Sequence, residues 1–160
     1  MNIRVIALFA TLALLGACSS DNASTGAATG SGTTGSAIGG GAPGSQEDLV
    51  ANIGDRVFFA LDQTTLSSDA RTTLDRQSAW LARYPQVSIQ LAGNCDERGT
   101  AEYNLALGQR RANAARDYLV ARGVSSARVT TISYGKERPT APGSDEQAWA
   151  QNRNATTSVR

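Results

Sequence analysis

Hydrophobic and polar residues change their spacing along the second part of the chain, and the changes predict strands and helices in turn. Residues 57–61 (VFFAL) form a short continuous apolar run, which predicts a buried strand. Residues 87–92 alternate apolar and polar side chains, as a strand with one buried face does. Between these strands we expect a helix that starts at Ser67 or Ser68, either of which can cap it, and that ends just before Pro85.

The rest of the chain continues this alternation of elements. A long helix is predicted from about Ala101 to Arg122, and Gly123 is suited to end it as a C-terminal cap. The other expected elements are short: helices at 48–53 and 146–152, and strands at 129–134 and 155–159. Strands alternating with helices indicate an α/β fold, here an α+β sandwich in which helices cover a sheet.

The N-terminal residues have the pattern of a secretion signal. The apolar run Val5–Leu15 is too short for a membrane-spanning helix, which needs about 20 residues, and has the length of a signal-peptide core. Residues 15–18 (LGAC) resemble the lipobox of bacterial lipoproteins. That resemblance implies acyl chains on Cys18 and, with Ser19 after it, delivery to the outer membrane. The alternative is an ordinary cleaved signal with an incidental cysteine.

A low-complexity segment follows the cysteine. Residues 19–45 are almost wholly Ser, Thr, Gly and Ala, with Ile38 as their only large apolar residue. Such a segment cannot bury an apolar face, so we expect it to be disordered, with a typical end-to-end distance of roughly 30 Å. The predicted organisation is a signal peptide at 1–17, a lipidated cysteine with a flexible linker at 18–45, and a folded domain at 46–160.

Composition excludes several classes of function. The formal net charge of +1 offers no basic excess for nucleic-acid binding, so no nucleic-acid partner is expected. The chain has no His, which removes Ser-His-Asp and Cys-His catalysis and most zinc sites. We expect no cofactor, no metal and no enzymatic activity. A cell-wall hydrolase using Asp96 and Glu97 is the alternative, but adjacent carboxyls are poorly arranged to flank a glycosidic bond.

One charged residue falls on the apolar face of the predicted long helix. Arg111 lies in the middle of that face, which is formed by Tyr103, Leu107, Ala114, Ala115 and Tyr118. A buried guanidinium needs a partner, and its side chain leans toward the helix N-terminus, where the loop at 93–99 carries Asp96. Two interpretations stay open. Asp96 and Arg111 form an architectural salt bridge, or they form a clamp that binds a ligand with one positive and one negative group.

The clamp interpretation has a chemical basis. Arg binds a carboxylate through a bidentate fork, and Asp is suited to an ammonium group. A free amino-acid head carries both groups. Few such ligands suit the periplasm better than diaminopimelate, whose far end in uncrosslinked peptidoglycan is a D-amino-acid head, so it is the ligand that we expect.

Several ordered motifs in this region resemble those of the peptidoglycan-associated lipoproteins, within the OmpA-like domain family. The similarity covers about residues 55–159. It is carried by residues 96–100 (DERGT), 102–104 (EYN), 106–108 (ALG), 110–112 (RRA), 133–139 (SYGKERP) and the pair Asn152-Arg153. The resemblance implies an OmpA-like domain with a mixed sheet of about four strands covered by helices.

The resemblance also implies roles for particular residues and partners. Asp96 and Arg111 match the pair that binds diaminopimelate, and Arg98, Leu107 and Asp62 match further positions of the pocket. The implied function is non-covalent binding to peptidoglycan, with Tol proteins, especially TolB, as partners in envelope integrity and cell division. The alternative is a generic OmpA-like cell-wall-binding lipoprotein without Tol partners.

This sequence departs from the family pattern at three positions. Cys95 replaces a small residue, and we interpret it as a buried inert thiol rather than a redox group. Leu61 stands where Phe is common, which affects the shape of the pocket. Asn154 replaces the second Arg of the usual Asn-Arg-Arg, so the role of that Arg is in doubt.

Overall fold

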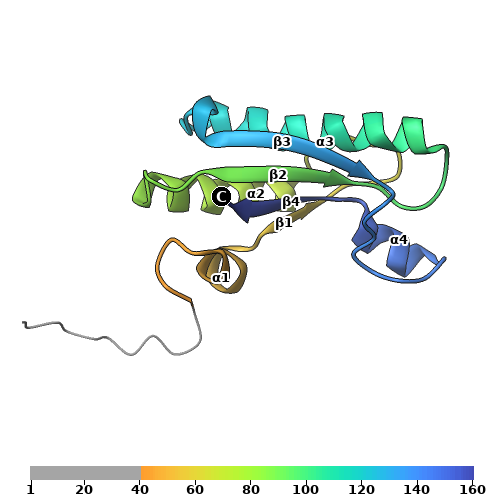
Figure 1. Cartoon of the computed structure of the whole chain (residues 1–160), viewed down its shortest axis with the longest axis horizontal. Helices are drawn as coiled ribbons and strands as arrows, with labels where there is room; N and C mark the ends of the chain where they lie inside the picture. The colour runs from red at the N-terminus through yellow and green to blue at the C-terminus, as the bar shows by residue number, and fades with distance from the viewer. Residues whose placement is uncertain (1–40) are drawn as a thin grey trace, which may run out of the picture. The chain divides into compact units, whose positions relative to one another are not determined.

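A computed structural model describes residues 41–160, and its centre is one four-stranded mixed sheet (Figure 1). The strands are β1 (Arg56–Phe58), β2 (Ile89–Asn94), β3 (Val129–Gly135) and β4 (Asn154–Val159), in the order β1-β4-β2-β3. β2 and β3 are parallel, whereas β4 runs antiparallel to both β1 and β2. The predicted fold class, an α+β domain with a mixed sheet of about four strands, is confirmed.

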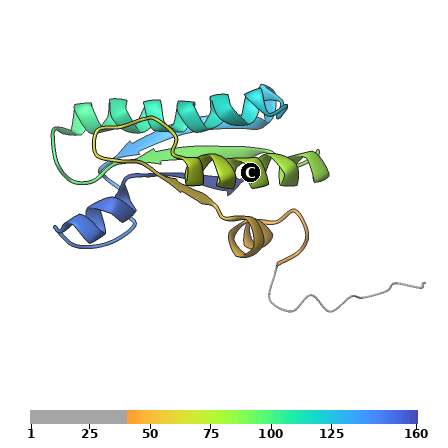
Figure 2. The same ribbon diagram turned by 180° about the vertical axis from the view of Figure 1, so that it is seen from behind.

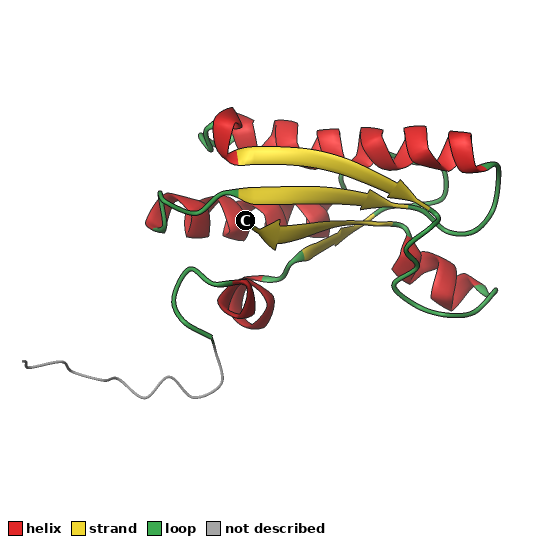
Figure 3. Cartoon of the chain, in the orientation of Figure 1, coloured by secondary structure: helices red, strands yellow, loops and turns green. Residues whose placement is uncertain are grey.

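Two long helices cover one face of this sheet (Figure 2). They are α2 (Ser68–Arg83) and α3 (Ala101–Ala121). The shorter elements, visible in Figure 3, are α1 (Gln46–Asp48), the π-helical turn η1 (Leu49–Ile53), the 3₁₀ turn η2 (Ser126–Arg128) and α4 (Glu146–Asn152). The core lies between the sheet and the helices and contains the fully buried side chains of Leu74, Leu81, Ile89, Leu91, Ala115 and Leu119.

Local signals set the ends of the two long helices. The Ser67 hydroxyl accepts a hydrogen bond from the backbone of Ala70 at the start of α2. The Thr100 hydroxyl does the same for Tyr103 at the start of α3. Gly123 follows α3 with a φ of 95°, a left-handed conformation that glycine adopts readily. The predicted bounds of both helices are therefore confirmed to within a residue or two.

The first strand is shorter than the predicted buried run at 57–61. Only Arg56, Val57 and Phe58 pair with β4, and the side chains alternate: Val57 is buried, whereas Phe58 is 42% exposed. The continuous run was therefore wrongly interpreted as buried throughout. The chain then turns away from the sheet, and Asp62 adopts a left-handed φ of 56°.

The buried face of α3 is also displaced from the predicted one. Its buried residues are Asn104, Leu107, Gly108, Arg111, Ala112, Ala115 and Leu119. Arg111 does lie on this face, but Tyr103 lies at its edge and is 45% exposed. Tyr103 is thereby placed at the surface, near the end of β2.

The predicted signal peptide, the lipidation site Cys18 and the linker up to residue 40 lie outside the described residues. Within residues 41–160, α1 begins at Gln46, where Ser45 caps it through its side chain. Among these same residues, no helix has both the length and the apolar character needed to cross a membrane.

Candidate ligand-binding site

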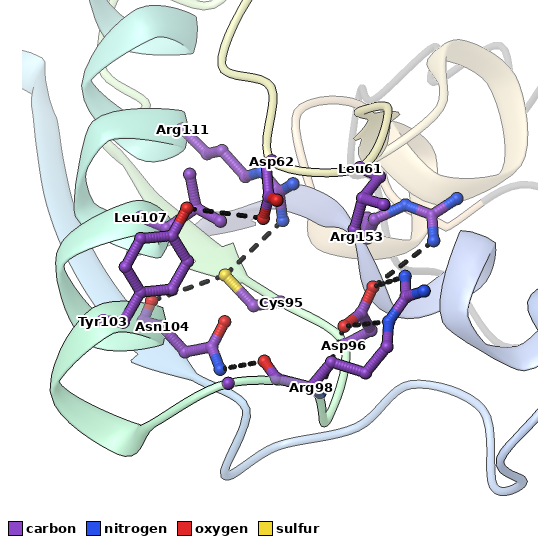
Figure 4. Close-up of a pocket in the computed structure, with 11 residues that line it drawn as sticks. Leu61, Asp62, Cys95, Asp96, Arg98, Tyr103, Asn104, Leu107, Arg111 and Arg153 are labelled. Carbon is purple, nitrogen blue, oxygen red and sulfur yellow. Dashed lines mark hydrogen bonds and ion pairs between the residues drawn. The ribbon is translucent and has the colours of Figure 1, made fainter.

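A cavity of about 300 Å³ opens where the end of β2, the start of α3 and the loop after β1 meet (Figure 4). All five residues that the sequence predicted for the pocket line it: Asp62, Asp96, Arg98, Leu107 and Arg111. Six more complete the lining: Leu61, Cys95, Gly99, Tyr103, Asn104 and Arg153. The structure therefore brings the predicted set together in one place, although they come from three separate segments of the chain.

Arg111 reaches from α3 into this cavity and has no exposed surface of its own. Its guanidinium donates hydrogen bonds to three backbone carbonyls: Nε to Gln63 at 3.0 Å, Nη1 to Asn94 at 2.9 Å and Nη2 to Ala60 at 3.1 Å. Nη1 also contacts the Sγ atom of Cys95 at 3.4 Å. These neutral acceptors fix the position of the guanidinium.

Within the described part of the chain, the charge of Arg111 has no carboxylate partner. No acidic side chain within residues 41–160 forms an ion pair with it. The architectural alternative, an Asp96–Arg111 salt bridge, is therefore wrong. Burial lowers the pKa of Arg111, but a guanidinium stays protonated in proteins, so the pocket holds a positive charge that is bonded to neutral carbonyls while Asp96 and Asp62 act on it only from a distance.

Asp96 pairs instead with two other arginines. Its Oδ2 atom lies 2.6 Å from Nη2 of Arg98 and 3.3 Å from Nη1 of Arg153. Burial opposes ionisation of this carboxyl group, but hydrogen bonds from the side chain and backbone of Arg98 and from Arg153 outweigh it and lower the pKa of Asp96. Asp96 is therefore a firmly ionised carboxylate on one wall of the pocket.

A second carboxylate stands at the rim. Asp62 follows β1 in the turn with positive φ, and its Oδ1 atom accepts a hydrogen bond of 3.3 Å from the hydroxyl of Tyr103 on α3. This contact joins the two sides of the opening, as Figure 4 shows. The pocket thus combines the buried cation of Arg111, which forms no ion pair within residues 41–160, with one buried carboxylate that is paired with arginines and one exposed carboxylate.

The loop between β2 and α3 is braced from two sides. The Asn104 amide, on α3, donates to the backbone carbonyls of Arg98 at 2.7 Å and Thr100 at 3.1 Å. Lys136, just after β3, donates from Nζ to the carbonyls of Gly99 at 2.8 Å and Glu97 at 3.2 Å. These bonds hold the loop that carries Asp96 and Arg98 in a fixed conformation.

Arg153 is the main pocket residue that sequence reasoning did not include. It lies between α4 and β4 and is 7% exposed. Besides Asp96, it bonds the Phe59 carbonyl at 3.1 Å and the Glu146 carboxylate at 2.7 Å. The motif at Asn152-Arg153 was its only signal in the sequence. Cys95 also lines the pocket; it is 3% exposed, and burial raises its pKa.

The lining offers three arginines and two carboxylates to an organic ligand rather than a cage for a metal, and two of the arginines are already paired with Asp96. Among residues 41–160, no group of three or more Cys, Asp or Glu side chains is placed to hold a metal ion. The opposite charges suit a small ligand with both an anionic and a cationic group.

Comparison with known proteins identifies the family. The model of the OmpA family matches residues 58–153, more than half of the chain. A peptidoglycan-associated lipoprotein of Rhizobium meliloti is 54% identical over 158 residues, which is 96% of this chain and 85% of the relative. One from Pseudomonas putida is 43% identical over 154 residues, 94% of this chain and 92% of the relative. The chain therefore belongs to the OmpA family and, within it, to the peptidoglycan-associated lipoproteins.

Solved structures agree with this assignment. The crystal structure of the peptidoglycan-associated lipoprotein from Burkholderia pseudomallei has a TM-score of 0.65 and 43% identity, covering 66% of this chain and 90% of that chain. The C-terminal domain of Helicobacter pylori MotB has a TM-score of 0.62 at 20% identity, covering 66% and 84%. The second match shows a shared fold alone.

Proposed function

We propose that this pocket binds the free head of diaminopimelate in the peptide of peptidoglycan, without a covalent bond. The observation that carries the proposal is Arg111: a fully buried charge that faces a cavity and has no carboxylate partner among the described residues. A ligand carboxylate would supply the missing counter-charge. A buried ion is stabilised when such a partner arrives in good geometry.

The remaining lining suits the rest of the same ligand. Asp96 and Asp62 provide anionic groups for the ammonium of the head, and Leu107 provides an apolar surface for the aliphatic chain. A cavity of about 300 Å³ is at the small end of ligand pockets, which fits an amino-acid head rather than a whole muropeptide. The rest of the peptidoglycan would lie outside the pocket.

The ionisation of Asp96 favours a binding role for the pocket over a hydrolytic one. A general acid needs a carboxyl group whose pKa is raised toward neutrality. The pKa of Asp96 is lowered, and arginines occupy its oxygens. Asp96 is thus suited to hold a cation and poorly suited to donate a proton to a glycosidic oxygen.

The direct test is binding of Arg111→Lys to isolated sacculi and to a soluble diaminopimelate muropeptide. Lysine keeps the charge but cannot bond the carbonyls of Gln63, Asn94 and Ala60 and also present an N–H of fixed direction to the ligand carboxylate. Affinity should therefore fall about ten- to a hundredfold, or about 1.4–2.8 kcal/mol. Arg116→Lys changes a partly exposed arginine on the same helix, is the matched control and should bind normally. Wild-type protein should also bind weakly to a muropeptide whose terminal carboxylate is amidated. Equal affinity for the amidated and free ligands would overturn the proposal.

We further propose that acyl chains on Cys18 anchor the protein in the outer membrane, so that the domain links this membrane to the cell wall. The lipobox-like residues 15–18 and the lipoprotein names of the relatives support this. Cys18→Ala should leave a form that a salt wash releases from membranes. Continued sedimentation of that variant with the outer membrane would rule out lipid anchoring.

The proposed partners are the Tol proteins, TolB in particular, with a role in envelope integrity and cell division. The support is membership in the peptidoglycan-associated lipoproteins. The alternative is a generic OmpA-like cell-wall-binding lipoprotein without Tol partners. Capture of TolB from the same organism by the purified domain separates the two, since only the first predicts a complex.

A further inference from the structure

The two arginines on Asp96 differ in how firmly they are held. The Arg153 side chain is 8% exposed and is also bonded to the carbonyl of Phe59 and the carboxylate of Glu146. The Arg98 side chain is 35% exposed, and among residues 41–160 its guanidinium donates hydrogen bonds to Asp96 alone. Arg98 is therefore the partner that can leave Asp96 at a smaller cost.

Asp96 has no room for another donor while Arg98 stays in place. Its Oδ1 atom accepts from the backbone N–H and from Nε of Arg98, and its Oδ2 atom accepts from Nη2 of Arg98 and Nη1 of Arg153. These four bonds fill the approximately four acceptor sites of a carboxylate. A ligand ammonium can bond Asp96 only after one donor departs.

Trp149 of α4 contacts the guanidinium of the partly exposed Arg98. The guanidinium carbon of Arg98 lies 4.1 Å from the centroid of the Trp149 ring, a cation–π contact. The indole Nε1 of Trp149 donates to the Glu97 carboxylate at 3.1 Å, which fixes the ring beside the pocket loop. The Arg98 guanidinium is thus stacked on a ring that is itself held by a hydrogen bond.

We infer that, in the unliganded protein, the Arg98 guanidinium occupies the ammonium position of the site on Asp96 and that the ligand's ammonium displaces it. This inference rests on the proposed binding of an amino-acid head. Arg98 and Trp149 then determine specificity. Because Arg98 competes with the ligand's ammonium for Asp96, the difference in affinity between a ligand that has an ammonium group and one that lacks it becomes smaller. A ligand with only a carboxylate can pair with Arg111 and leave Arg98 where it is.

The test compares two ligands on wild type and Arg98→Met. One is a muropeptide with diaminopimelate, and the other lacks the amino group of the free head. In Arg98→Met, Asp96 keeps the backbone N–H and Arg153 but gains two open acceptor sites. The ratio of the two affinities should rise about two- to fivefold, because a partly exposed ion pair no longer opposes the ammonium. If Arg98 only contacts the ligand carboxylate, both affinities fall together and the ratio is unchanged, which would overturn the inference.

A matched control and a direct observation complete the test. Arg138→Met removes another arginine stacked on an aromatic ring, that of Tyr134 at 3.8 Å, and should leave the ratio unchanged. In NMR spectra the Nε–H signal of Arg98, assigned by its loss in Arg98→Met, should lose protection from solvent when muropeptide binds. A signal that stays protected in the complex would contradict displacement. If wild type binds neither ligand, the proposed function fails and this inference fails with it.

Discussion

Nη1 of Arg111 donates a hydrogen bond of 2.9 Å to the backbone carbonyl of Asn94, so a side chain of α3 is tied to the end of β2. Nε and Nη2 of the same guanidinium reach the carbonyls of Gln63 and Ala60, in the turn after β1. One side chain therefore joins three segments that are distant in the sequence. The charge proposed to bind the ligand also holds the walls of its pocket together.

Arg111→Ala should therefore reduce the stability of the domain as well as binding. The substitution removes a donor from the carbonyls of Gln63, Asn94 and Ala60, of which Ala60 keeps the bond from the backbone N–H of Gln63. The contact with the buried Asn94 is the most costly to lose, because a buried polar group that is left unpaired costs about 1–3 kcal/mol. We expect the free energy of unfolding to fall by about 3 kcal/mol or more in urea titrations. Arg116→Ala, at a partly exposed position of α3 outside the core, should change it by less than about 0.5 kcal/mol. Equal stabilities for the two variants would contradict an architectural role of Arg111.

Asp96 should make the domain more sensitive to acid. Its pKa is lowered in the folded protein, because the hydrogen bonds from Arg98 and Arg153 outweigh the opposing effect of burial. A depressed folded-state pKa contributes stability above the unfolded value, near 3.8, which is lost as the pH falls through the folded value. In urea titrations, wild type should exceed Asp96→Asn in stability at pH 7, and the difference should shrink below about pH 4. A difference that is the same at every pH would contradict this.

The sequence predicted those elements whose ends are set by neighbouring residues. Ser67 and Gly123 act on the backbone within a few positions, so the bounds of α2 and α3 could be identified from local chemistry. The end of β1 depends on pairing with β4, almost 100 residues later, and only Arg56, Val57 and Phe58 find partners there. The apolar run at 57–61 does not show which of its residues will pair with β4.

The same distinction applies to the pocket. A charge within an apolar helical stripe marked Arg111 as unusual, and the motif at 96–100 directed attention to Asp96. The actual partners of Arg111 are backbone carbonyls, which any residue type supplies, so the sequence could not identify them. Arg153 lies 57 positions after Asp96, and only folding of β4 beside β2 brings the two together.

Gly93 should be essential for the close packing of α3 against the sheet. A Cβ atom at this position would collide with the backbone carbonyl of Gly108, which cannot move without shifting the helix. Gly93→Ala should lower the free energy of unfolding by about 3 kcal/mol or more, at the upper end for overpacking, and should weaken ligand binding by moving Arg111 away from Asn94.

Gly123→Ala is the comparison for this prediction. An added Cβ there meets no atom within 4 Å, so its cost is only that of the left-handed backbone, about 1–2 kcal/mol. Thermal melts and urea titrations of both variants measure the difference. If Gly93→Ala is no less stable than Gly123→Ala, the helix is not held at the distance that the structure indicates.

Cys95 should be dispensable for binding even though it lines the pocket. Its thiol contacts Arg111 and the carbonyl of Asn104, both at 3.4 Å, and a serine hydroxyl can make the same two contacts. Burial raises the pKa of Cys95 more than the nearby charge of Arg111 lowers it, so the group is a protonated thiol at neutral pH and a poor nucleophile. In a Cys18→Ser background, a thiol reagent should modify the native domain far more slowly than the unfolded chain, and bound muropeptide should slow it further.

Cys95→Ser should bind sacculi within about twofold of wild type, since the guanidinium keeps its three carbonyl partners. A large loss of binding in a variant that melts normally would show that the sulfur atom itself contacts the ligand.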